Sequence, residues 1–105
     1  MDKLLEIMTA IGIPFAYDHF AEGGSPEPPF ICYLLPSDDN FSADGRVYYK
    51  VARVHIELYT DRKSLELEQR IEAALDAHGV FYSKTETWIE SERLYEVIFS
   101  FETGV

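Results

Sequence analysis

The stretch from Val47 to Thr60 constrains the fold most, because an alternating segment there leads directly into an amphipathic one that begins near Ser64. Apolar residues occupy every second position of its main part, namely Ala52, Val54, Ile56 and Leu58. The positions between them hold Arg53, His55, Glu57 and Tyr59. This period of two is typical of a strand with one buried and one exposed face. The chain therefore needs a sheet packed against a helix.

The segment after Ser64 is the clearest predicted helix. Its apolar face consists of residues at helical spacing, Leu67, Ile71, Ala74, Leu75 and His78. Glu66 and Glu68 fall in the first turn, where the helix dipole favours acid, and Gly79 follows as a stop signal. We expect Leu67, Ile71 and Leu75 to be buried, and we expect Glu68→Gln to have little effect on stability.

A shorter helix is predicted at the start of the chain, where Leu4, Leu5, Met8 and Ile11 precede Gly12. Four strands are predicted at 30–35, 46–60, 80–90 and 94–102, the last two forming a hairpin. Pro36 is expected to end the strand at 30–35, with a loop over 36–45. Residues 15–20 could form a short extended piece.

These elements predict a single α+β domain over residues 1–105. Its mostly antiparallel four-stranded sheet is packed by two helices, in the order helix-strand-strand-helix-strand-strand. The helical crossover between the second and third strands leaves open a parallel neighbour.

Charge limits the function classes. Acidic residues outnumber basic ones 19 to 9, so the net charge is -10 and specific nucleic-acid binding through a basic face is not expected. The only cysteine, Cys32, lies in an apolar run, which favours a small buried thiol and a reducing compartment. No signal peptide or membrane span is expected, so the sequence indicates a cytoplasmic protein.

Motifs for catalysis or metal binding are weak. His55 and Glu57 share a strand face, but the zinc-deaminase pattern that they resemble needs a Cys-x-x-Cys partner. Oxygen ligands alternate from Asp38 to Asp44 as in a calcium loop, yet Ala43 and Tyr49 replace the required glycine and glutamate. We expect no enzyme activity, no metal and no cofactor.

Aromatic residues exceed what one small core usually needs and suggest a protein interface. The 36–45 segment is expected to become ordered against a neighbouring subunit, with Phe41 as its anchor and Asp44-Gly45 as a turn. The predicted interface residues are Asp38, Asp39, Asn40, Phe41, Asp44, Tyr48, Tyr49 and Trp88.

Several stretches resemble a known class of proteins. They are FAEGGSPEPP, ICYLLP, DNFSADGRVYYKV, VHIELYTDRK and KTETWIESERLYEV. Together they resemble tail-completion or tail-terminator proteins, which join heads to tails in long-tailed phages and prophages of Gram-positive bacteria. The resemblance covers nearly the whole chain and carries no catalytic signature.

The resemblance implies a structural virion protein of α+β fold that forms a homo-oligomeric ring on the tail tube. Its implied partners are other tail and connector proteins. It would be found in the host cytoplasm during assembly and then in the virion tail, and could be monomeric in solution. An acidic DNA-mimic inhibitor and a small ligand-binding regulatory domain remain open alternatives.

Overall fold

The computed structural model describes residues 2–19, 26–38, 41–43, 46–49 and 51–104. Along the chain, its elements are α1 (Asp2–Ile11), β1 (Phe15–Tyr17), β2 (Phe30–Asp38), β3 (Phe41–Ala43), β4 (Arg46–Tyr49), β5 (Val51–Thr60), α2 (Leu65–Ala77), β6 (Tyr82–Ile89) and β7 (Leu94–Gly104). The α+β class and both helices are as predicted.

The sheet differs from the prediction. It has five strands in the order β1-β2-β5-β7-β6, and a separate two-stranded sheet joins β3 to β4. Strand β1 runs parallel to β2, whereas the other pairs in the large sheet are antiparallel. The prediction of four strands, and of their order, was therefore wrong. The parallel pair comes from β1 and not from the α2 crossover, because β7 lies between β5 and β6.

Pro36 does not end its strand, contrary to the prediction. The register between β2 and β5 shifts between Leu34 and Ser37, which places Pro36 at a bulge. Strand β1 pairs with β2 only from Ile31 to Tyr33, so a proline beyond that point removes no hydrogen bond to β1. Strand β2 can therefore continue to Asp38.

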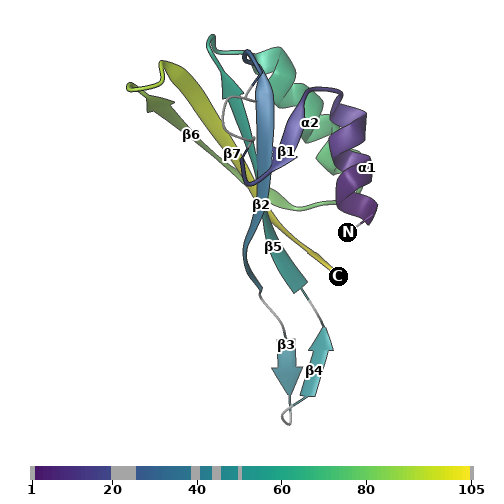
Figure 1. The fold of residues 1–105 in the computed structure, drawn as a ribbon. Helices are drawn as coiled ribbons and strands as arrows, with labels where there is room; N and C mark the ends of the chain where they lie inside the picture. Colours follow the sequence, from purple (N-terminus) through teal and green to yellow (C-terminus); the bar gives the residue numbers. More distant parts are fainter. Residues whose placement is uncertain (1, 20–25, 39–40, 44–45, 50, 105) are drawn as a thin grey trace.

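The core lies between the helices and one face of the sheet, on the side that carries both α1 and α2 (Figure 1). The alternating apolar residues of β5 are all buried, as predicted, and so are Ile71 and Leu75 of α2. Leu67 is partly buried against the same cluster. The four apolar residues buried on α1 are Leu4, Ile7, Met8 and Ile11.

Capping contacts fix the ends of α2. The Ser64 hydroxyl accepts a hydrogen bond from the Leu67 amide at 3.3 Å, which satisfies one of the free donors of the first turn. At the other end His78 is the C-cap residue, its Nδ1 lying 2.8 Å from the Ala74 carbonyl oxygen. Gly79 then has a φ of 66°, a left-handed conformation that suits glycine. Arg70 also donates to the Ile11 carbonyl, joining α2 to the end of α1.

The described chain is elongated, with extents of 49 × 29 × 22 Å. Figure 1 shows why: the β3–β4 hairpin stands away from the helices and from the large sheet. No helix in the described part of the chain is long and apolar enough to cross a membrane.

Candidate functional site

The projecting hairpin holds most of the described residues that were predicted to form an interface. We call the β3–β4 hairpin and the strand ends that carry it, residues 36–51, the arm. Phe41 is in register with Tyr49, and Tyr48 lies beside it in β4. Asp38 stands at the base of the arm, in register with Ala52 of β5. The prediction of a loop over 36–45 was therefore wrong for the described part of it, which is β-structure.

Three of the predicted interface residues lie outside the described residues, namely Asp39, Asn40 and Asp44. The predicted Asp44-Gly45 turn lies outside them as well.

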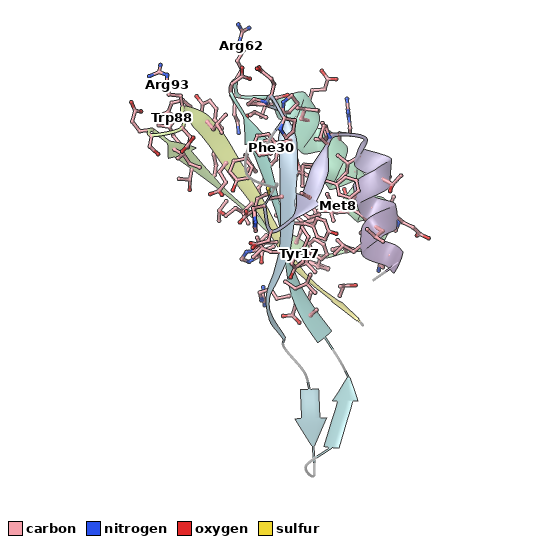
Figure 2. The ribbon with its side chains drawn as sticks, viewed as in Figure 1. Met8, Tyr17, Phe30, Arg62, Trp88 and Arg93 are labelled. Atoms are coloured by element: carbon pink, nitrogen blue, oxygen red, sulfur yellow. The ribbon has the colours of Figure 1, made fainter. Side chains whose placement is uncertain are left out.

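Trp88 does not lie with the arm. Figure 2 places it beside Arg93, close to the β6–β7 turn and at the end of the sheet opposite the hairpin. Its ring packs on Tyr95 with the centroids 4.8 Å apart, and its Nε1 donates to Glu90 at 2.5 Å. Trp88 is 40% exposed. The predicted interface therefore separates into the arm and a second surface on β6.

Strand β6 forms one edge of the large sheet. Its outer side pairs with no strand among the described residues. Phe81, directly before β6, is 96% exposed, although the sequence reasoning did not select it. Its exposure follows from its position in the chain. Val80 and Tyr82 on either side of it pack on the core, so Phe81 points outward. A single exposed ring is common on protein surfaces, so Phe81 and the unpaired side of β6 together mark only a candidate contact surface.

A buried carboxylate connects β6 to α2. Glu68 is only 2% exposed, and its two oxygens lie 2.6 Å from Lys63 Nζ and 2.7 Å from Lys84 Nζ. Burial alone would raise the pKa of Glu68, but the hydrogen bonds and charges of the two lysines outweigh it and hold the pKa below its usual value. Lys63 also contacts Glu86 of β6. These contacts lead us to expect that Glu68 contributes to stability, contrary to the expectation from the sequence.

A second carboxylate extends this network. Glu72 accepts a hydrogen bond from the Tyr82 hydroxyl at 2.9 Å and lies 3.5 Å from Lys84 Nζ. Burial and this hydrogen bond raise the pKa of Tyr82 to about 12. Tyr82 and Lys84 of β6 are thus joined to α2 by polar contacts.

The opposite face of the sheet carries a different cluster. The Tyr59 hydroxyl lies 2.7 Å from Glu96 and 3.1 Å from Glu57. Burial raises the pKa of Glu57, and the negative charge of Glu96 adds to this, although the hydrogen bond from Tyr59 acts in the opposite direction. Arg53 pairs with Glu102 at 2.7 Å on the same face.

The described residues contain no group of three or more side chains suited to hold a metal ion. Cys32 is buried, and its pKa is raised by burial and by the nearby negative charges of Glu57 and Asp18. A thiol in such surroundings behaves as an apolar group and is a poor nucleophile. The arm and the β6 edge are the two candidate contact surfaces among the described residues.

Comparison with known proteins gives a likeness of fold and no match in sequence. No family model matches the sequence, and no curated protein matches it. A solved structure, described as the virion of native gene transfer agent (GTA) particle, contains a chain of similar fold. The superposition has a TM-score of 0.63 at 14% identity and covers 99% of this chain and 89% of that one. The likeness is therefore one of fold, and it extends over nearly the whole chain.

Proposed function

We propose that this chain is a structural protein of a phage-like particle, acting at the head-tail junction as a tail-completion or tail-terminator subunit. It assembles there as a ring on the tail tube and contacts the neighbouring tail and connector proteins. The observation that carries the proposal is the fold likeness to a chain of the gene transfer agent virion. The sequence resemblance described above points to the same class of protein.

The arm supports an assembly role. A two-stranded hairpin is marginally stable in water unless it packs on something else. Here the hairpin stands apart from the large sheet and is rich in aromatic residues, Phe41, Tyr48 and Tyr49. A subunit that packs such an arm against its neighbour would stabilise the hairpin.

Charge also fits a junction through which DNA passes. The net charge of -10 opposes adhesion of a phosphate backbone to the subunit. The acidic groups are spread over α2, the outer face of the sheet and the β6–β7 hairpin, whereas a DNA mimic would gather them into one strip. For a ligand-binding domain we would look for an enclosed pocket, but the hollow lined by Leu5, Glu6, Thr9 and Ala10 is shallow and open. An enzymatic role is not part of the proposal.

Reconstitution with neighbouring gene products tests this function. The protein is mixed with the tail-tube and connector proteins encoded beside its gene, and the products are imaged by electron microscopy. We expect a ring at the head-proximal end of the tube. Tubes that stay bare at saturating protein contradict the proposal.

An arm-deleted variant makes the test specific. Because Asp38 and Ala52 are register partners, replacing residues 39–51 by Asn-Gly should close β2 and β5 with a two-residue turn. This variant should keep its helices and its large sheet but fail to attach to tubes. Glu66→Gln is the matched control, since the Glu66 side chain is 86% exposed on α2, away from both the arm and β6. Its attachment should equal that of the wild type.

A further inference from the structure

Strand β6, at one edge of the large sheet, can make a further contact that does not depend on the proposed function. Strand β6 offers eight residues of open edge, whereas the opposite edge strand β1 has three. An open edge presents unpaired backbone donors and acceptors and can pair with another strand. The side chains of β6 indicate which strand can pair with this edge.

The sequence of β6 is chemically self-complementary. In an antiparallel pair of two β6 strands centred on Thr85, Lys84 faces Glu86 and Ser83 faces Thr87. Tyr82 then faces Trp88, an aromatic pair. Opposite charges and aromatic rings directly across a ladder stabilise an antiparallel sheet. The side chains of Lys84 and Glu86 are 33% and 43% exposed, so both remain partly accessible to a second copy despite their contacts with Glu68 and Lys63.

Neighbouring symmetric registers are unfavourable. Centring the pair on Lys84 places two lysines opposite each other, and centring it on Glu86 places two glutamates opposite each other. Like charges in such positions destabilise a ladder. The charge order of β6 therefore disfavours both neighbouring registers relative to the one centred on Thr85.

The same register accounts for the exposed Phe81. It lies opposite Ile89 of the second copy, so two apolar side chains meet at each end of the ladder. Phe81 is 96% exposed in the single chain, and this pairing would remove part of its ring from water.

We propose that two copies of this chain associate through their β6 edges, antiparallel and centred on Thr85, to form one continuous sheet. The contact is isologous, so it closes at two copies and cannot by itself form a ring. It uses neither the arm nor the fold likeness. The proposal therefore stands or fails separately from the head-tail function.

Thr85 is the residue that tests this register, because it alone faces itself. Thr85→Lys and Thr85→Glu each place like charges across the axis, and each should weaken the dimer by roughly tenfold or more in dissociation constant. An equimolar mixture of the two variants should form a heterodimer at least as well as the wild type. The readout is analytical ultracentrifugation over a concentration series.

Ser91→Lys is the matched control, since it adds the same charge at an exposed position of the β6–β7 turn, outside the proposed ladder. It should dimerise nearly as the wild type does. A wild type that stays monomeric up to about 1 mM overturns the proposal. A dimer or larger ring that is indifferent to Thr85→Lys and Thr85→Glu also overturns it.

Amide hydrogen exchange tests the proposed β6 contact on the wild-type protein, without any substitution. On raising the concentration, exchange in β6 should slow, while exchange in β1 should stay unchanged. Unchanged exchange in β6 at concentrations where the protein is dimeric overturns the proposal.

Discussion

Lys84 Nζ lies 2.7 Å from Glu68 Oε1, and this contact joins the edge strand β6 to helix α2. Glu68 is buried, whereas Lys84 retains access to water. The pair therefore holds the edge strand against α2 while leaving its outer side open.

Replacing the buried carboxylate should destabilise the fold. Glu68→Gln removes the charge that both Lys63 and Lys84 contact, and we expect a loss of about 1 to 3 kcal/mol in the free energy of unfolding. Chemical denaturation measures it. Glu66→Gln is the control, because its side chain is 86% exposed, and it should leave the stability nearly unchanged.

Lowering the pH should weaken the stabilisation that Glu68 and Lys84 provide. Because the folded-state pKa of Glu68 lies below the ordinary glutamate value of 4.5, its stabilisation is present above that value and is lost as the pH falls through the folded-state pKa. The difference in unfolding free energy between wild type and Glu68→Gln should therefore shrink as the pH is lowered from 7 towards 3. A difference that stays constant over this range would show that ionisation of Glu68 is not the cause.

Glu57 should behave in the opposite way. Its pKa is raised, mainly by burial, so its contribution to stability is greatest below 4.5 and is lost as the pH rises through the folded-state pKa. Glu57→Gln should then be neutral or stabilising at pH 7, where it removes a partly buried charge, and its advantage should vanish in acid. Thermal melts at several pH values measure this, and a large loss of stability at pH 7 would refute it.

The core face of α2 makes a direct test of the packing. Ile71 is fully buried, so Ile71→Asp places an unpaired charge in the core and should cost about 4 kcal/mol or more. Gln69→Asp puts the same side chain on an exposed position of the same helix. Circular dichroism should show an unfolded Ile71→Asp and a folded Gln69→Asp.

Metal removal should have no effect. The candidate ligand sets in the sequence depart from known metal sites, so EDTA, calcium and zinc should each leave the melting temperature unchanged to within about 1 °C. A substantial fall with EDTA, or a rise with stoichiometric metal, would contradict this expectation.

Strong periodicity made part of the fold predictable. The alternation in β5 and the helical spacing of α2 reflect burial against one core, and both appear at the predicted places. Ser64 and Gly79 bound α2 for local reasons that can be read from the sequence alone.

Tertiary context decided what the sequence did not reveal. Strand β1 is only three residues long and depends on pairing with β2. Pro36 is tolerated because it lies at a bulge, and a glutamate in a first helical turn normally faces water. Glu68 is buried because Lys63 and Lys84, from segments before and after α2, meet there. No local pattern encodes such a meeting.

Deletion of the gene tests the proposed head-tail function most directly, with electron microscopy of the phage-like particles produced. We expect filled heads and finished tails that remain separate. They should join when the wild-type protein is supplied, but not when the arm-deleted variant is supplied. Normal yields of joined particles without the gene would contradict it.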